Sequence, residues 1–219
     1  MGLERIPAKG PVILAINHVN FIDVLLYTIV RREMTALVKE ETQNNPILRL
    51  LFTAWNAIPI RRGELDLRAI RLALQALRDG KVLAIAVEGT RSHHGRLQRG
   101  RPGIALLASH VSETFIVPVA IYGGERFYGN LRRLRRTKLN VLFGQGFFLD
   151  AGDRRVTRAV RQEIVDEIMM QIASLLPPEN RGIYSDLAAA TEHCLRFPPG
   201  ATSNLPRALS QPASKTGKQ

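Results

Sequence analysis

The sequence predicts a single α/β domain, with a largely parallel or mixed sheet flanked by helices. Two observations predict it: short apolar runs alternate with helical patterns, and a chain of 219 residues with 45% hydrophobic content can bury a full core. The predicted strands are residues 12–16, 35–38, 57–60, 82–87, 115–121 and 139–143. Strands that alternate with helices favour parallel pairing, so we expect one layered domain.

Two of the predicted helices follow from local signals. The helix over residues 23–30 begins with Asp23, which places an acid at the positive end of the helix. In residues 67–77 leucine and isoleucine recur at helical spacing. Gly80 then closes the segment as a C-terminal cap.

The last long helix is predicted to begin at Asp153, which can cap it. Valine and isoleucine recur every four residues from 156 to 172, and Pro177 ends the pattern. This stripe indicates core packing. Residues 198–219 are rich in Pro, Ser, Ala and Lys and are expected to form a disordered tail, so the domain is predicted to span residues 1–197.

A histidine and an aspartate follow the first predicted strand, in the run Asn17-His18-Val19-Asn20-Phe21-Ile22-Asp23. An imidazole titrates near neutrality and a carboxylate can hold its second nitrogen, so the pair can act as a general base on a hydroxyl. The two side chains meet if His18 lies in the turn that leaves the strand and Asp23 in the first turn of the helix. A structural histidine beside an N-cap is the alternative.

A carboxylate and an arginine follow the strand predicted over residues 82–87, in the run Glu88-Gly89-Thr90-Arg91. Gly89 permits a tight turn with close approach, and Arg91 offers a planar fork of donors for a phosphate. A surface turn with a solvated arginine is the alternative.

Arg62 follows residues 57–60 in the same way, either as an exposed charge or as a second phosphate ligand. Because ligands gather beyond the carboxyl ends of strands in open α/β sheets, His18, Arg62 and Glu88 can converge on one crevice. The strand over residues 115–121 contains Val117-Pro118. A proline in a central strand removes a ladder hydrogen bond, so we expect an edge, a bulge or a strand end there.

In their order and spacing these four segments resemble the blocks of the glycerolipid acyltransferase superfamily: Asn-His-x-x-x-x-Asp, Ile-Pro-x-x-Arg, Glu-Gly-Thr-Arg and Val-Pro. They cover most of residues 2–122. The best-known members are the 1-acylglycerol-3-phosphate acyltransferases. Two departures stand out: Val87 replaces the proline that commonly precedes the third block, and the fourth block is short.

The resemblance implies the superfamily fold and acyl transfer from acyl-CoA or acyl carrier protein to the hydroxyl of a lysophospholipid. The expected acceptor is 1-acylglycerol 3-phosphate, which would give phosphatidic acid. His18 would be the general base, held by Asp23. Arg62 with the run Glu88-Gly89-Thr90-Arg91 would bind the acceptor phosphate and glycerol. Val117-Pro118 would lie on the acyl-donor side, with a purely structural role as the alternative.

Other functions stay open beside this one. The acceptor could be another lysolipid, such as lyso-ornithine lipid, or the fold could serve as a non-catalytic membrane-surface binding protein. A metal hydrolase using His18, Asp23 and His93-His94 is disfavoured, because adjacent histidines on a strand point apart and nearby arginines repel a dication. We therefore expect no metal, and no cofactor apart from the acyl thioester as co-substrate.

The net charge of +12 favours anionic partners, and 25 of the 31 basic residues are arginine. Residues 126–138 interleave aromatic and aliphatic side chains with cations, which suits contact with lipid headgroups on an anionic membrane surface. A solvated loop is the alternative. Nucleic acid is not expected, because no recognised nucleic-acid motif accompanies the cluster.

No run approaches the roughly 20 apolar residues that a spanning helix needs, and no secretory leader pattern is present. The single Cys194 excludes an internal disulfide and fits a reducing cytosol. We expect a cytoplasmic protein that is peripheral at the inner membrane face. Many relatives carry an N-terminal membrane helix, so this chain is expected to be either a short peripheral form or one whose start has been trimmed.

Overall fold

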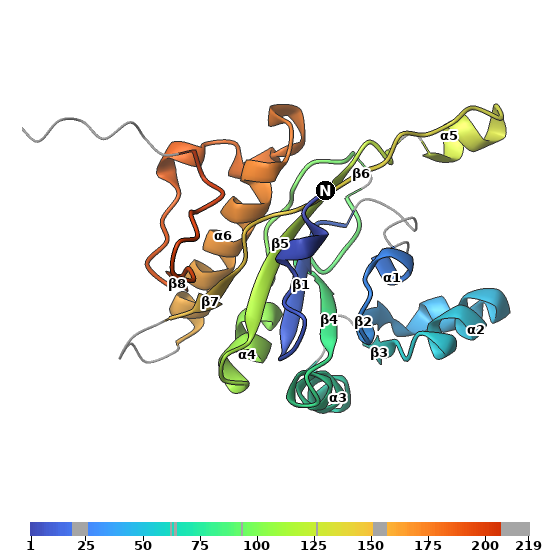
Figure 1. The fold of residues 1–219 in the computed structure, drawn as a ribbon. Helices are drawn as coiled ribbons and strands as arrows, with labels where there is room; N and C mark the ends of the chain where they lie inside the picture. Colours follow the sequence, from blue (N-terminus) through green and yellow to red (C-terminus); the bar gives the residue numbers. More distant parts are fainter. Residues whose placement is uncertain are drawn as a thin grey trace, which may run out of the picture.

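The computed structural model describes residues 1–18, 26–61, 63, 65–92, 94–125, 127–150 and 157–206. Within these residues the strands form one mixed eight-stranded sheet that is flanked by helices (Figure 1). The strands are β1 (Val12–Ile16), β2 (Met34–Lys39), β3 (Ile58–Ile60), β4 (Val82–Ala86), β5 (Phe115–Tyr122), β6 (Asn140–Phe143), β7 (Phe147–Leu149) and β8 (Leu195–Arg196). The predicted α/β class and mixed sheet are confirmed.

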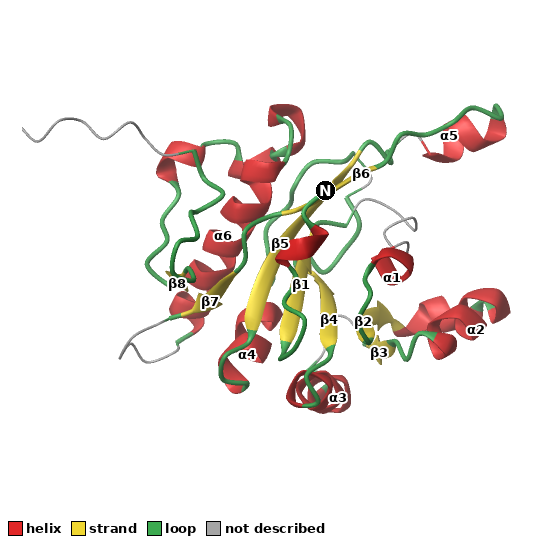
Figure 2. Cartoon of the chain, viewed as in Figure 1, coloured by secondary structure: helices red, strands yellow, loops and turns green. Residues whose placement is uncertain are grey.

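Helices fill most of the connections between these strands (Figure 2). The α-helices are α1 (Leu26–Ile29), α2 (Pro46–Ala54), α3 (Leu67–Arg78), α4 (Gly103–His110), α5 (Phe127–Arg132) and α6 (Arg158–Leu175). Short 3-10 helices are η1 (Leu3–Arg5), η3 (Glu40–Asn44), η4 (Pro178–Asn180), η5 (Gly182–Tyr184) and η6 (Leu187–Ala189).

The strand order is β3-β2-β4-β1-β5-β7-β8, and β6 also pairs with β5. The five strands from β3 to β5 in this order are parallel, whereas β6, β7 and β8 are antiparallel to their neighbours. The carboxyl ends of β1, β4 and β5 therefore lie together at the centre of one sheet edge. This edge is where the first and third sequence blocks leave their strands.

Both faces of the central strands are buried, which explains their continuous apolar runs. Ile13 of β1 faces the core under α3, α4 and α6, whereas the neighbouring Leu14 faces the opposite side, with Leu26 of α1. Figure 1 shows α3, α4 and α6 along one face of the sheet. The successive side chains of a strand thus supply two separate cores.

The predicted helix ends agree with the structure in α3 and differ in α6. Asp66 is the N-cap of α3 and accepts a hydrogen bond from Ala69 N–H at 2.9 Å, and Gly80 follows the helix with a φ of +72°. Helix α6 begins at Arg158 with Thr157 as its N-cap, so the expected start at Asp153 was wrong. Asp153 itself lies outside the described residues. A threonine whose hydroxyl reaches the N–H of Val160 supplies the cap instead.

The chain remains ordered beyond residue 197, where the tail was expected to begin. The side chain of Asn204 accepts a hydrogen bond from Gln145 N–H at 2.6 Å and donates to the Gln145 carbonyl at 2.9 Å. It also donates to Gln171 of α6 at 2.8 Å. The segment up to residue 206 is therefore packed against the body, and residues 207–219 lie outside the described chain.

Val117 and Pro118 lie inside the long central strand β5, and both are buried. Opposite them the partner strand is interrupted between β6 and β7, where Gly144 N–H donates to the Pro118 carbonyl at 2.8 Å. A Cβ added at Gly144 would lie 2.9 Å from the Pro118 ring, so only glycine fits there. The expected edge or strand end at Pro118 was therefore wrong, and the break in the ladder falls on the partner strand instead. The two buried side chains have a packing role, and contact with an acyl donor stays a prediction.

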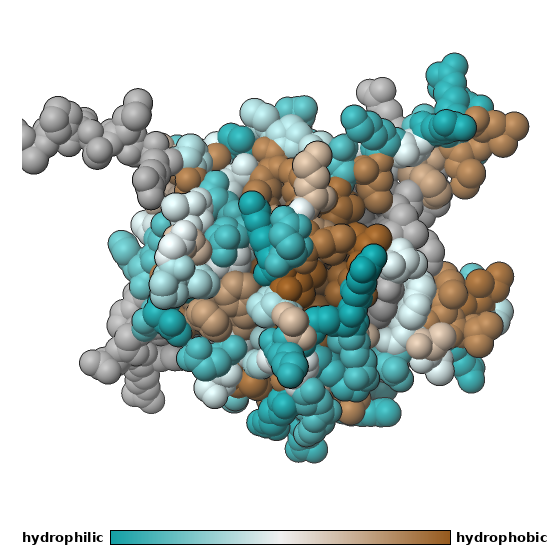
Figure 3. Space-filling view, viewed as in Figure 1, coloured by the Kyte–Doolittle hydropathy of each residue, from teal (hydrophilic) through white to brown (hydrophobic). Residues whose placement is uncertain are grey.

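Two segments project from the same side of the molecule in Figure 1, α2 and the arm formed by residues 127–138, which includes α5. Both carry exposed leucine or isoleucine, and both end in hydrophobic surface in Figure 3. Leu134 of the arm is 94% exposed, and Ile47 of α2 is 69% exposed. No helix in the described part of the chain is both long and apolar enough to cross a membrane.

Candidate functional site

The register of the sheet places the first and third blocks side by side. Ile16 is the last paired residue of β1 and lies opposite Ala86, the last residue of β4. Val87 extends this ladder by one step, because its N–H donates to the Ile16 carbonyl at 3.0 Å. A proline has no N–H and could not donate this hydrogen bond. The valine that replaces the usual proline before the third block therefore strengthens the connection between the two blocks.

Hydrogen bonds then join His18 directly to the third block. The backbone N–H of His18 donates to Glu88 Oε1 at 3.3 Å, and the His18 carbonyl accepts from Ser92 N–H at 2.8 Å. Both backbone polar groups of His18 are therefore held by the loop that follows β4. The imidazole is carried on a fixed backbone at the carboxyl edge of the sheet.

Glu88 is the buried centre of this arrangement, with only 1% of its surface exposed. Its second oxygen, Oε2, accepts from Gln98 N–H at 2.7 Å. A buried carboxylate costs free energy unless donors surround it, and here backbone N–H groups from two segments supply them. Because a carboxylate repels a phosphate, this geometry gives Glu88 a positioning role. Its predicted contact with the acceptor stays a prediction.

Asn17, the residue before His18, fixes the end of β1 against β5. Its side chain donates to the Ile121 carbonyl at 2.8 Å and accepts from Ile121 N–H at 2.7 Å. The side-chain amide thus continues the sheet after the β1 ladder ends. Asn17 is 2% exposed, so its role is structural. This role explains why an asparagine precedes the histidine in the first block.

Gly89 makes the turn that presents Thr90 and Arg91, as its position in the sequence predicted. Its φ is +68°, and a Cβ there would lie 3.1 Å from Arg101 Cγ. A left-handed conformation costs an ordinary residue about 1–2 kcal/mol, so both the backbone and the close approach require glycine. Thr90 and Arg91 are exposed beyond the turn, where they can reach a ligand.

Ser92 closes the loop behind Arg91. Its hydroxyl donates to the Arg96 carbonyl at 2.6 Å and lies 3.2 Å from His94 Nδ1. Ser92 is 2% exposed, so the loop is held by a buried hydroxyl rather than by surface contacts. This network explains how an exposed Arg91 can keep a defined position.

The second block lies at the same edge of the sheet, beyond β3. Arg61 donates through Nε to Glu40 at 2.7 Å, and its N–H donates to Asp66 at 3.1 Å. Its guanidinium is therefore engaged by Glu40 at the surface. Arg62 and Asp23, two of the predicted site residues, lie outside the described residues.

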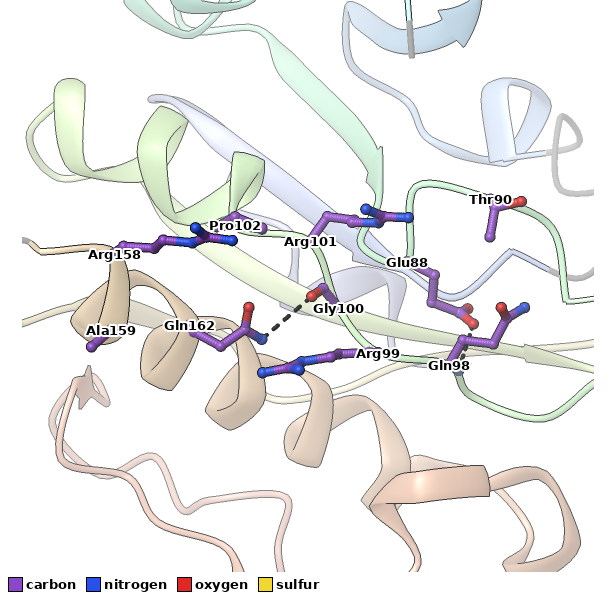
Figure 4. A pocket seen from close by; sticks show the side chains of 10 residues that line it. All are labelled: Glu88, Thr90, Gln98, Arg99, Gly100, Arg101, Pro102, Arg158, Ala159 and Gln162. Carbon is purple, nitrogen blue, oxygen red and sulfur yellow. Dashed lines mark hydrogen bonds between the residues drawn. The ribbon is translucent and has the colours of Figure 1, made fainter. Parts of the chain in front are cut away.

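A basic cavity of about 800 Å³ opens beside the third block (Figure 4). Glu88 and Thr90 line one end, and Arg99, Arg101 and Arg158 line the rest. In Figure 4 the Arg158 side chain reaches from α6 toward Pro102, and Arg101 lies next to the Glu88 turn. The cavity thus joins the predicted site to arginines from two other segments.

The backbone under this cavity is anchored by a buried tyrosine. Tyr184 donates to Asp166 at 2.8 Å and accepts from Gly100 N–H at 3.2 Å. Burial, together with the hydrogen bond to Asp166, raises the pKa of the Tyr184 hydroxyl well above its usual range. The hydroxyl therefore stays neutral at physiological pH and holds Gly100 in place.

An apolar cavity of about 530 Å³ adjoins the basic one. It lies between α3, α4 and the ends of β3 and β4, and its lining includes Ile60, Ile70, Ile85 and Leu107. Arg101, Pro102 and Arg158 line both cavities, and Gly89 lines the apolar one. The site therefore has two neighbouring cavities beside the third block. One suits an aliphatic chain, and the other suits an anionic group.

Sequence reasoning found His18, Glu88, Gly89, Thr90 and Arg91, and the structure brings these together. It did not find the residues that complete the cavity, which are Gln98, Arg99, Arg101 and Arg158. Gln98 contributes its backbone N–H, which any residue type could supply. The run Arg99-Gly100-Arg101 downstream of the third block was a signal for the two arginines, whereas Arg158 is distant in sequence.

Comparisons with known proteins agree with this geometry. Residues 1–122 match the family described as Acyltransferase. A 1-acyl-sn-glycerol-3-phosphate acyltransferase from Borreliella burgdorferi is 27% identical over 131 residues, which cover 58% of this chain and 52% of that protein. The chain thus spans about half the length of this curated relative.

A solved structure shares the fold. It is the crystal structure of the 1-acyl-sn-glycerophosphate (LPA) acyltransferase, PlsC, from Thermotoga maritima, with a TM-score of 0.56 and 21% identity. The match covers 77% of this chain and 67% of that one. Because the family match spans more than half of the chain and includes all four blocks, the chain belongs to the acyltransferase family, within the glycerolipid acyltransferase superfamily that its blocks resemble.

Proposed function

We propose that this protein transfers a fatty acyl group from a thioester, acyl-CoA or acyl carrier protein, to the free hydroxyl of a lysophospholipid. The preferred acceptor is 1-acylglycerol 3-phosphate, and the product is phosphatidic acid. One observation carries the proposal: His18 is hydrogen-bonded through its backbone to Glu88 and Ser92, and Glu88 also lines the basic cavity, which adjoins an apolar one. The named activities of the relatives support the same reaction.

His18 acts as the general base. Its imidazole takes the proton of the acceptor hydroxyl while that oxygen attacks the thioester carbonyl carbon. The tetrahedral intermediate collapses with cleavage of the carbon–sulfur bond, and the imidazolium returns the proton to the leaving thiolate. Asp23 orients the ring and stabilises its charged form. No covalent acyl-enzyme is needed, and no cofactor or metal takes part beyond the thioester itself.

Arg91, with Thr90 and Gly89, holds the acceptor phosphate and glycerol, and Arg62 assists from the second block. Guanidinium forks bind phosphate through paired charge-assisted hydrogen bonds. Binding the acceptor at a fixed place beside His18 makes the attack effectively intramolecular. Glu88 contributes by fixing the His18 backbone.

The apolar cavity takes the aliphatic chain of a substrate. Each buried methylene group contributes about 0.8 kcal/mol to binding, so a cavity lined by isoleucine and leucine discriminates in favour of long chains. Its position next to Gly89 places the end of such a chain near the third block.

The protein works at an anionic membrane surface from the cytoplasmic side, where its lipid substrates are found. Leu131 and Leu134 are exposed on the arm, between basic residues Arg132, Arg133, Arg135, Arg136 and Lys138. Exposed aliphatic side chains among cations suit the headgroup region of a bilayer. Arg126, at the start of the predicted basic cluster, lies outside the described residues.

An acyl-transfer assay tests the proposal. The purified full chain is given acyl-CoA or acylated carrier protein with a panel of acceptors, and both thiol release and lipid product are followed. We expect thiol release that depends on the acceptor, with phosphate-bearing lysolipids ahead of lyso-ornithine lipid. Thiol release without an acylated product, or no release with any pair, would contradict the proposed function.

A further inference from the structure

We propose that Arg99, Arg101 and Arg158 form a phosphate-binding pocket in addition to the Arg91 loop. It would take a phosphate group of one of the two substrates. The inference rests on the proposed function and deepens it, because none of these three arginines belongs to a recognised sequence block. The three line one cavity together with Glu88 and Thr90.

The first argument is uncompensated charge. Within the described residues none of the three arginines forms an ion pair with a carboxylate. Arg99 also lines a neighbouring cavity with Glu163, Asp166 and Glu167, so the charge is least compensated at Arg101 and Arg158. Buried Glu88 is the carboxylate in the cavity lining, and its oxygens accept backbone N–H groups from His18 and Gln98. The three arginines are exposed to solvent, and like charges that share a cavity repel one another, so the cavity attracts an anion.

The second argument comes from two helix starts that meet at the cavity. Helix α4 has Pro102 as its N-cap with no side-chain cap, and no acid lies in its first turn. Helix α6 has no acid in its first turn either, and Arg158 is its first residue. A cation at the positive end of an 18-residue helix is unfavourable, whereas an anion there is stabilised.

The third argument is that the segment carrying two of the arginines is rigid. Arg99 and Arg101 flank Gly100, whose N–H donates to the Tyr184 hydroxyl and where an added Cβ would overlap Val165 of α6. The Arg101 N–H donates to the Val87 carbonyl at 2.8 Å. A fixed backbone lowers the ordering cost of binding, so the pocket is organised before its ligand arrives.

The position of the pocket fits either substrate of acyl transfer. Arg101 and Arg158 also border the apolar cavity, so a molecule with an aliphatic chain in that cavity can place a phosphate on these guanidiniums. Both the acceptor and the phosphopantetheine part of the donor carry such a phosphate. The shared ligand chemistry is therefore a phosphate monoester or diester beside an acyl chain.

Direct binding to the full chain distinguishes the two sources. Isothermal titration with CoA represents the donor, and titration with glycerol 3-phosphate represents the acceptor, at the same ionic strength. The variants are Arg158→Gln and Arg99→Gln, and the control is Arg78→Gln, an exposed arginine on α3 with the same change of charge. We expect about a tenfold loss of affinity for one probe in each pocket variant, as for other charge-assisted contacts.

A loss for CoA alone assigns the pocket to the donor, and a loss for glycerol 3-phosphate alone assigns it to the acceptor. Arg158→Gln should also keep or raise the melting temperature, because it removes a cation from the start of α6. Affinities equal to those of Arg78→Gln for both probes, or no binding of either probe to the unaltered protein, would overturn the proposal. A protein that binds CoA through these arginines but transfers no acyl group would refute the proposed function and leave the pocket standing.

Discussion

At the scale of single residues, the site depends on a carboxylate that does not itself need to touch a substrate. Glu88 is buried and accepts the N–H groups of His18 and Gln98. A buried charge is costly, so its presence is best explained by the position that it gives to His18. The same side chain connects the first block to the loop that carries Arg91.

Glu88→Gln is expected to weaken both stability and catalysis. A glutamine keeps one carbonyl oxygen, but an NH₂ group replaces the second oxygen. This NH₂ group cannot accept the hydrogen bond of the backbone N–H that faces it. We expect a loss of about 1–3 kcal/mol in the free energy of unfolding, measured by urea denaturation, and at least a tenfold slower acyl transfer. Glu179→Gln, at an exposed position, is the control. Equal behaviour of the two variants would remove Glu88 from the positioning role.

Single residues were predictable where residue type carries the function. His18 and Arg91 have side chains with distinctive chemistry, and Gly89 is required by its left-handed backbone. Gln98 was not predictable, because only its backbone N–H is used. The structure places His18 and Arg91 beside one loop, and the roles predicted for His18, Asp23, Arg62 and Arg91 stay predictions.

At the scale of elements, helix α3 connects the second block to the apolar cavity through its N-cap. Asp66 accepts from Ala69 N–H inside the helix and from Arg61 N–H in the preceding loop. These backbone hydrogen bonds lower the pKa of the Asp66 carboxyl below its usual value, and the one from Ala69 has the largest effect. The ionised form is therefore the one that caps the helix.

A lowered pKa means that Asp66 stabilises the fold above the ordinary carboxyl pKa and loses this effect as the pH falls through its lowered value. In Asp66→Asn the amide oxygen still accepts a hydrogen bond but cannot titrate. We expect the unfolding midpoints of the two proteins to differ near neutrality and to converge as the pH falls through the lowered pKa of Asp66. Thermal unfolding across this pH range measures the difference, and a gap that stays constant with pH would contradict the capping account.

Elements with a long apolar pattern were predicted, and short ones were not. The six predicted strands correspond to β1 through β6, whereas β7 and β8, with three and two residues, have no readable pattern. The start of α6 was misplaced because aspartate and threonine are both good N-caps, and only the folded chain selects Thr157.

At the scale of the whole molecule, the sheet gathers segments that are distant in sequence at one edge, and the arm leaves the body from this same edge, just after the carboxyl end of β5 (Figure 1). Sequence alone could not show that Arg158 lines the same cavity as Arg99 and Arg101, because this depends on how α6 packs against α4. The basic and aliphatic character of the arm was readable from composition, but its projection from the body was not.

The arm is expected to govern binding to anionic membranes. Removing two of its charges in Arg133→Gln/Arg135→Gln should cost about 2 kcal/mol of binding to phosphatidylserine vesicles, since each surface cation contributes about 1 kcal/mol. The control, Arg71→Gln/Arg78→Gln on α3, has the same net charge. Vesicle co-sedimentation measures both, and an equal loss in the two proteins would assign membrane binding to overall charge instead of to the arm.

The most direct measurement of the central claim is the single-turnover rate of acyl transfer by the His18→Ala protein. The control is His110→Ala, which alters an exposed histidine on α4. Because general-base catalysis contributes about 10²- to 10⁴-fold, we expect a loss of this size or greater in His18→Ala, with unchanged circular dichroism and melting temperature. A folded His18→Ala protein that transfers acyl groups as fast as His110→Ala would contradict the account.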